Sequence, residues 1–252
     1  MKAQIVLTSS ESKRLIAKAI VRMESVQRAL KSGTVVICRG STNAFIAEEI
    51  SGQRKEKGGY TAGYIGPKGL SVNHKIPEEV IFVDGKLQEN LTLTQVLKDL
   101  KQGDLIIKGA NAIGPDNIPG LLCARRPSSL GGTLGTFQIP SMTRGIEVIV
   151  PVGLEKSIPI SVLIGVREVA SAKIDYSTGV PCGFIPVFGT VVTEIQAMKI
   201  LADVDAIPIA AGGIGGAEGS VCLLVKGSDA HVKEIIKIVE DIKGEQPIAE
   251  PT

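Results

Sequence analysis

A short strand that runs into a helix through a glycine-serine-threonine turn is the feature that most constrains the fold of this chain. Residues 34–38 are mostly apolar and mostly β-branched, which predicts a buried strand, and a helix is expected to begin at Ser41 or Thr42 after a turn at Gly40. The first N–H groups of such a helix have no acceptor within it, and the helix dipole attracts anions to them. The turn therefore predicts either a phosphate-binding site at Gly40, Ser41, Thr42 and Asn43 or a simple helix cap.

Strands and helices alternate on both sides of this turn. An amphipathic helix with apolar residues three and four positions apart precedes it, and short strands are expected at 80–83, 104–107 and 145–150. A turn at Asp84 and Gly85 and a threonine-capped helix separate the first two of these strands. This order predicts an α/β fold in which a layered, mostly parallel sheet has helices on both faces.

The order changes in the last part of the chain. Residues 183–245 are expected to run strand–helix–strand–strand–helix, which is typical of a small ferredoxin-like α+β domain. We therefore expect an α/β ligand-binding domain over 1–175, the small domain over 183–245, and a tail over 246–252.

A glycine-rich segment, residues 212–219, lies between the last two expected strands. Glycine-rich dinucleotide-binding turns are followed by a helix, so a dinucleotide site is rejected here. A hairpin connection or a contact between subunits is the expected role, and a ligand-binding loop is the minor alternative.

Composition excludes several classes of function. The formal net charge is +2, aromatic residues make up 3% of the chain and tryptophan is absent, so neither a basic surface nor stacking rings for nucleic acid are expected. The four cysteines are far apart and there are two histidines, so we expect reduced thiols, no metal site and no cofactor. Without a signal peptide or a membrane-length apolar stretch, a cytoplasmic protein with no membrane contact is expected.

Further polar residues follow the other expected strands. Lys108 and Asn111 come after one strand, and Glu155 and Lys156 come after another. Ligands collect outside the carboxyl ends of parallel strands, so these side chains are candidates for the same crevice as Ser41.

Another candidate segment combines two arginines with glycines. Arg125 and Arg126 precede Gly131 and Gly132, and arginine suits phosphate or carboxylate while glycine lets the backbone approach a ligand. The segment lacks the lysine-serine/threonine ending of a P-loop.

Taken in order, these motifs resemble the ribose-5-phosphate isomerase A family. The resemblance rests on Lys13, the turn at 40–42, the segment 104–115, Gly131-Gly132 and the segment 154–156. The wider superfamily includes sugar-phosphate-sensing domains of DeoR-type repressors, glucosamine-6-phosphate deaminases and CoA transferases. The resemblance implies an anionic ligand such as a sugar phosphate, a nucleotide or a CoA-type compound, and a small α+β domain late in the chain.

The chain departs from the family at the catalytic positions. Lys108 and Asn111 stand where the isomerases carry carboxylates, and neither serves as a carboxylate base, so ribose-5-phosphate isomerisation is not predicted. The leading hypothesis is binding of an anionic metabolite, with isomerase- or transferase-type turnover through Lys108, Lys156 and Glu155 left open. The alternative is a non-catalytic metabolite sensor or an oligomeric assembly protein. In either case we expect a homo-oligomer.

Overall fold

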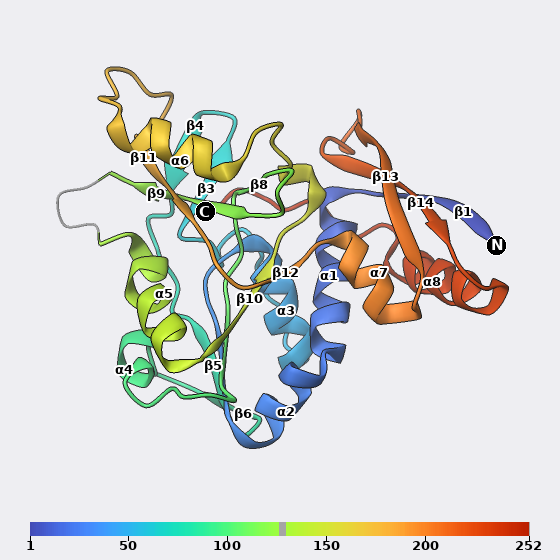
Figure 1. The fold of residues 1–252 in the computed structure, drawn as a ribbon, viewed down its shortest axis with the longest axis horizontal. Helices are drawn as coiled ribbons and strands as arrows, with labels where there is room; N and C mark the ends of the chain where they lie inside the picture. The colour runs from blue at the N-terminus through green and yellow to red at the C-terminus, as the bar shows by residue number, and fades with distance from the viewer. Residues whose placement is uncertain (126–129, 252) are drawn as a thin grey trace.

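The computed structural model describes residues 1–125 and 130–251 (Figure 1). The helices are α1 (Ser9–Arg22), α2 (Glu24–Ser32), α3 (Ser41–Ser51), α4 (Leu93–Leu97), α5 (Gly132–Arg144), α6 (Val162–Ser171), α7 (Glu194–Ala202), α8 (Asp229–Ile242) and the 3-10 helix η1 (Leu154–Lys156). The strands are β1 (Lys2–Leu7), β2 (Thr34–Ile37), β3 (Gly63–Gly66), β4 (Gly69–Val72), β5 (Val80–Val83), β6 (Lys86–Gln88), β7 (Leu105–Ile107), β8 (Ala112–Ile113), β9 (Pro119–Ala124), β10 (Glu147–Pro151), β11 (Cys182–Pro186), β12 (Thr190–Val192), β13 (Asp205–Gly212) and β14 (Ser220–Lys226). Within these described ranges, no helix has the length and apolar character needed to cross a lipid bilayer.

The main sheet has the strand order β12-β10-β7-β2-β5-β6. Its first four strands are parallel, whereas β5 and β6 are antiparallel additions joined through the turn at Asp84 and Gly85. The α/β class with a mixed, mostly parallel sheet is therefore confirmed. Because β2, β7, β10 and β12 point the same way, their carboxyl ends meet at one edge of the sheet.

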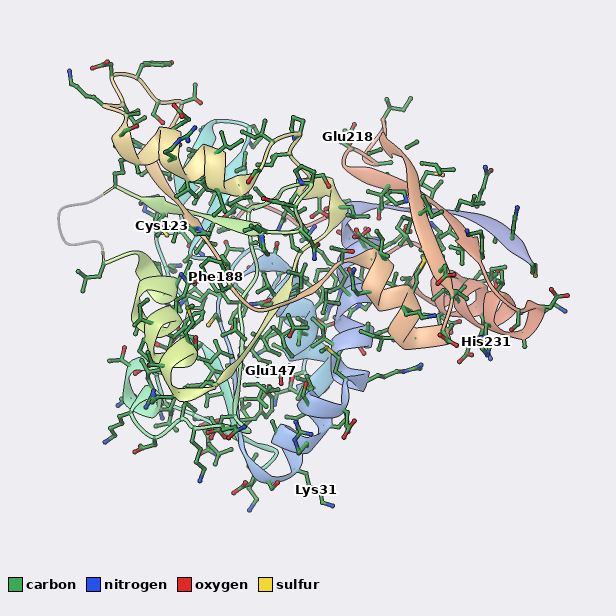
Figure 2. All side chains as sticks on the ribbon, viewed as in Figure 1. Lys31, Cys123, Glu147, Phe188, Glu218 and His231 are labelled. Carbon is green, nitrogen blue, oxygen red and sulfur yellow. The ribbon has the colours of Figure 1, made fainter. Side chains whose placement is uncertain are left out.

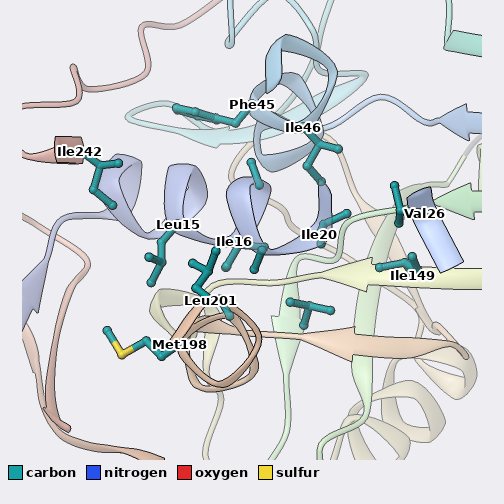
Figure 3. Packing of buried hydrophobic residues seen from close by; sticks show 14 of the residues in the cluster. Leu15, Ile16, Ile20, Val26, Phe45, Ile46, Ile149, Met198, Leu201 and Ile242 are labelled. Carbon is teal, nitrogen blue, oxygen red and sulfur yellow. The ribbon is translucent and has the colours of Figure 1, made fainter. Parts of the chain in front are cut away.

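Side chains alternate between the two faces of the main sheet, and each face has its own apolar core. Val35 and Ile37 of β2 pack into a cluster shared with α1, α3 and α7, while Val36 packs with Leu134 and Phe137 of α5 on the opposite face. Figure 3 shows α1 between α3 and α7 in the larger cluster. Helices thus cover both faces, and strands buried on both sides need the near-continuous apolar runs that the sequence has.

A second layer covers the carboxyl edge of the main sheet. It consists of the antiparallel sheet β8-β9-β11 with α6 and the hairpin β3-β4, which appear in the upper part of Figure 1. The Ile158 N–H donates to the Ile113 oxygen at 2.9 Å and links β8 to the segment after η1. The strand-end loops therefore lie beneath this layer rather than on an open surface.

The last part of the chain differs from the small domain that the sequence predicts. The first strand expected in that domain is two strands: β11 pairs with β9, and β12 joins the main sheet. The small sheet has the order β1-β14-β13, so the N-terminal strand lies beside β14. A self-contained ferredoxin-like domain over 183–245 is not confirmed, because element order along a chain does not determine which strands pair.

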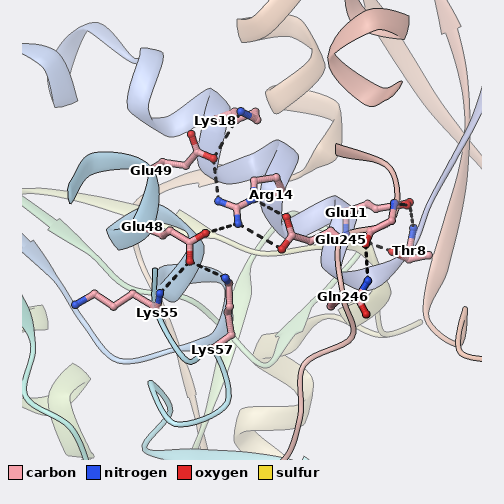
Figure 4. Close-up of polar contacts among 11 residues, drawn as sticks. Thr8, Glu11, Arg14, Lys18, Glu48, Glu49, Lys55, Lys57, Glu245 and Gln246 are labelled. Carbon is pink, nitrogen blue, oxygen red and sulfur yellow. Dashed lines mark hydrogen bonds and ion pairs between the residues drawn. The ribbon is translucent and has the colours of Figure 1, made fainter. Parts of the chain in front are cut away.

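The N- and C-terminal parts of the chain share one core and one ionic network. Arg14 of α1 contacts Glu48 at 2.7 Å and Glu49 at 2.9 Å on α3, and Glu245 at 2.8 Å after α8 (Figure 4). These carboxylates raise the pKa of Arg14, although burial opposes the shift. Ile248, in the expected tail, packs against the larger apolar cluster. Ion pairs and apolar packing therefore hold the segment after α8 against α1 and α3.

Candidate functional site

The start of α3 keeps the geometry that the glycine-serine-threonine turn predicts. Gly40 is the N-cap, no side chain caps the helix, and the Gly40 N–H donates to the Tyr60 oxygen at 2.8 Å. Tyr60 also donates its hydroxyl to the Ile37 oxygen at 2.6 Å, which fixes the end of β2. The first-turn N–H groups of α3 thus have no acceptor among residues 1–125 and 130–251 and are available to an external one.

Two side chains in this first turn are buried with unsatisfied oxygens. Thr42 is 2% exposed and Asn43 is fully buried. The Asn43 amide donates to the Cys38 oxygen at 2.7 Å and the Ile107 oxygen at 3.1 Å, which joins the ends of β2 and β7. Among the described residues, neither the Thr42 hydroxyl nor the Asn43 amide oxygen has a hydrogen-bond partner. Buried polar atoms are almost always paired, so these two point to a ligand or to bound water.

Lys108 follows β7 and lies beside this turn. Its side chain is buried, and its ammonium donates to the Arg39 oxygen at 3.2 Å. Burial lowers the pKa of Lys108 because an ammonium loses hydration there. Burial likewise raises the pKa of the neighbouring Cys38 thiol to about 12, so this thiol is protonated near neutral pH and is no nucleophile.

A cluster of buried charges follows β10 and β12. Lys13 of α1 contacts Glu155 of η1 at 2.6 Å, and their side chains are 5% and 11% exposed. The second carboxylate oxygen of Glu155 has no hydrogen-bond partner in the part of the chain that the structure describes. Lys156 donates its ammonium to the Ala110 oxygen at 2.8 Å in the loop after β7. The cluster therefore connects three strand ends to α1.

Glu194, the first residue of α7, completes this cluster. It is fully buried, and its two carboxylate oxygens accept the Leu154 N–H at 2.9 and 3.2 Å. Burial, with the nearby Glu155, raises the pKa of Glu194 to about 7. Burial also lowers the pKa of Lys156 to about 8. Both groups thus change charge close to neutral pH, which is common at functional sites.

The sequence did not single out Glu194 or give Lys13 a role in the site. The segment around Thr193 and Glu194 indicates only a capped helix start, and the structure has that cap. Lys13 lies in an amphipathic helix, where a lysine is expected on the solvated face. No local pattern signals that either side chain turns toward η1.

Asn111, Gly131 and Gly132, which the sequence also proposes for the site, lie outside the cluster of buried charges. The Asn111 oxygen accepts the Leu122 N–H at 3.0 Å and joins the ends of β8 and β9. Gly131 and Gly132 open α5, and Arg39 contacts Thr133 there at 3.4 Å, so this helix start lies near the β2 turn.

Of the two arginines proposed for the site, the structure describes one, Arg125. Arg125 donates to the Val169 and Ala172 oxygens at the end of α6, on the surface. Arg126 lies outside the described residues.

The glycine-rich segment joins β13 and β14 as a hairpin connection, as expected (Figure 2 labels Glu218 in it). A Cβ atom on Gly219 would lie 3.5 Å from the Glu155 Cβ atom, and Gly219 has a φ of +83°. The end of this connection therefore packs against the charge cluster.

Two surface hollows lie away from the strand-end charges. One, of about 560 Å³, is next to β5 and β6, and the other, of about 370 Å³, is next to the Arg14 network. Neither is lined by Ser41, Lys108 or Lys156. Both are wide open, and we favour the strand-end site because the unsatisfied buried atoms and the shifted pKa values lie there.

Comparison with known proteins leaves the family open. No protein-family model matches the sequence, and no curated protein sequence matches it significantly.

Proposed function

We propose that this chain binds a phosphorylated or otherwise anionic small metabolite at the carboxyl edge of its main sheet. One observation carries the proposal: the start of α3 has no side-chain cap, and the buried Thr42 hydroxyl beside it lacks a hydrogen-bond partner among the described residues. Helix N-termini of this kind bind anions through N–H groups and the helix dipole. Lys108 and Lys156 supply positive charge at neighbouring strand ends.

The resemblance to the ribose-5-phosphate isomerase A superfamily supports the same ligand class. It suggests a sugar phosphate, a nucleotide or a CoA-type compound, held by Gly40, Ser41, Thr42 and Asn43. Because fold resemblance does not fix chemistry, the proposal concerns binding first.

A thermal-shift series tests the proposal with inorganic phosphate, ribose 5-phosphate, a nucleotide and a CoA ester. A ligand present at about 100 times its Kd stabilises the folded state by about 2.7 kcal/mol, which raises Tm by roughly 5–10 °C for a chain of this size. We expect at least one of these anions to raise Tm, and the double variant Ser41→Ala/Thr42→Ala to reduce the shift.

A second variant separates binding from folding. In Ser41→Asp, a carboxylate in the first turn of α3 favours the helix but repels an anion, so the ligand-induced shift is expected to disappear while the protein stays folded. Ser228→Asp is the matched control, because Ser228 caps α8 at a different place and aspartate caps equally well. If no anion raises Tm, or if Ser41→Asp responds as the control does, the proposed site is wrong.

Acid–base turnover of the bound metabolite is a second candidate function. The observation that favours it is the pair Glu194 and Lys156, whose pKa values of about 7 and 8 leave both protonated and deprotonated forms available at neutral pH. Glu155 and Lys108 are nearby candidates for proton transfer. Isomerase- and transferase-type reactions are the classes that the resemblance suggests.

Incubation of a bound anion with the protein, followed by NMR of the products, tests turnover. Where turnover occurs, Lys156→Met is expected to lower its rate by about 10²–10⁴-fold, since a positioned proton-transfer group contributes that much. Binding of a stabilising ligand without any product would instead favour the metabolite sensor.

A further inference from the structure

The turn that carries Glu155 and Lys156 has little intrinsic stability. η1 is a single 3-10 turn of three residues, its N-cap Gly153 supplies no side-chain cap, and its internal hydrogen bonds join Lys156 to Gly153 and Ser157 to Leu154 at 3.0 Å. Short 3-10 segments have poor hydrogen-bond geometry. Something outside the turn must hold it in place.

Glu194, at the start of α7 just after the neighbouring strand β12, contributes to this. β10 and β12 run in register up to Pro151 and Val192, and the Val152 N–H still donates to the Val192 oxygen at 3.1 Å. One step further on, the Glu194 carboxylate replaces the backbone acceptor and takes the Leu154 N–H. The carboxylate thus extends the sheet pairing into η1.

The charges that face Glu194 come from two elements. Glu155 and Lys156 of η1 act on it, and Lys13 of α1 pairs with Glu155 beside it. The charge of Glu194 therefore acts on Lys156, one of the two lysines proposed to attract the anion.

We propose that Glu194 is a positioning residue that helps to hold η1 in place and that its proton makes anion binding at the strand ends depend on pH. The proposal rests on the proposed binding function. When Glu194 is protonated the strand ends carry one negative charge fewer, so an anion binds more tightly. When Glu194 loses its proton, the added negative charge opposes the ligand.

Sulfate is the probe for this proposal, because its charge stays constant between pH 6 and pH 8. Lys156 also titrates in this range, so the comparison uses Lys156→Arg, in which the charge is fixed, with and without Glu194→Gln. In Lys156→Arg we expect the Kd for sulfate to rise by about three- to tenfold from pH 6 to pH 8, because the negative charge that Glu194 gains repels the dianion. In the double variant we expect a change below twofold.

The outcomes separate the two proposals. Equal pH dependence in the single and double variants overturns the role of Glu194 while leaving anion binding intact. Absence of sulfate binding to the wild-type protein at every pH overturns the proposed function and this inference together.

Glu194→Asp tests positioning alone. Aspartate keeps the charge but is one methylene shorter, so it is expected to lose the Leu154 hydrogen bond and to weaken sulfate binding at both pH values, whereas Glu194→Gln keeps an acceptor and binds at pH 6 as the wild type does. Circular dichroism confirms that each variant is folded. Equal sulfate affinity in Glu194→Asp and the wild type would show that the carboxylate holds nothing in place.

Discussion

Replacing Lys13 with methionine is expected to lower the free energy of unfolding by about 3–5 kcal/mol, because it leaves Glu155 as a buried charge without its direct partner. The side chains of both residues are almost completely buried, so water cannot replace the lost ammonium. For a chain of this size the expected fall in Tm is roughly 6–20 °C. Urea unfolding followed by circular dichroism measures the effect.

Two controls show whether the loss comes from the unpaired charge. Lys13→Met/Glu155→Leu removes both charges and is expected to recover most of the lost stability, since an apolar pair often replaces a buried ion pair without penalty. Lys199→Met removes one partner of the exposed Lys199–Asp203 pair and is expected to leave stability unchanged. A Lys13→Met variant as stable as the wild type would mean that Glu155 is well hydrated.

Glu194→Gln is expected to change how stability depends on pH. Burial raises the pKa of Glu194 from its ordinary value of 4.5 to about 7, so the folded state holds this proton more tightly than the unfolded state does. Its favourable contribution is complete below pH 4.5 and is lost as pH rises through 7. Glutamine has no such proton, so the stability of the variant relative to wild type should increase by about 3 kcal/mol between pH 4.5 and pH 8.

Urea unfolding at a series of pH values measures this difference. Glu240→Gln, at an exposed position on α8, is the matched control and should follow the wild-type curve throughout. A constant difference between Glu194→Gln and wild type across the series would show that Glu194 ionises in the folded state as freely as in the unfolded one.

Local patterns predicted many elements correctly. The strand and helix on either side of Gly40 are β2 and α3, the predicted threonine cap before α4 is Thr92, and Asp84 and Gly85 form the predicted turn. In each case the information lies within a few neighbouring residues: a glycine, a capping hydroxyl or a short apolar run.

Other elements were not predicted because their local sequence patterns do not favour the structure that they adopt. α5 begins with glycines and contains Pro140, so its propensity is low, and tertiary packing of Leu134 and Phe137 stabilises it instead. The first predicted helix is divided at Met23 into α1 and α2, although its apolar spacing continues across the break. The spacing of apolar residues does not show where one helix ends and the next begins when both helices bury similar faces.

The sequence by itself determined the α/β class, the helix that starts at Ser41 and the placement of Lys108, Glu155 and Lys156 at strand ends. These follow from local propensity and from the rule that parallel strands share one carboxyl edge. Only the tertiary structure decided that β1 joins β14 and that Lys13 and Glu194 meet η1. Those contacts join residues more than a hundred positions apart or just beyond the ends of adjacent strands, and their partners are selected by burial and pairing across the whole fold rather than by neighbouring residues.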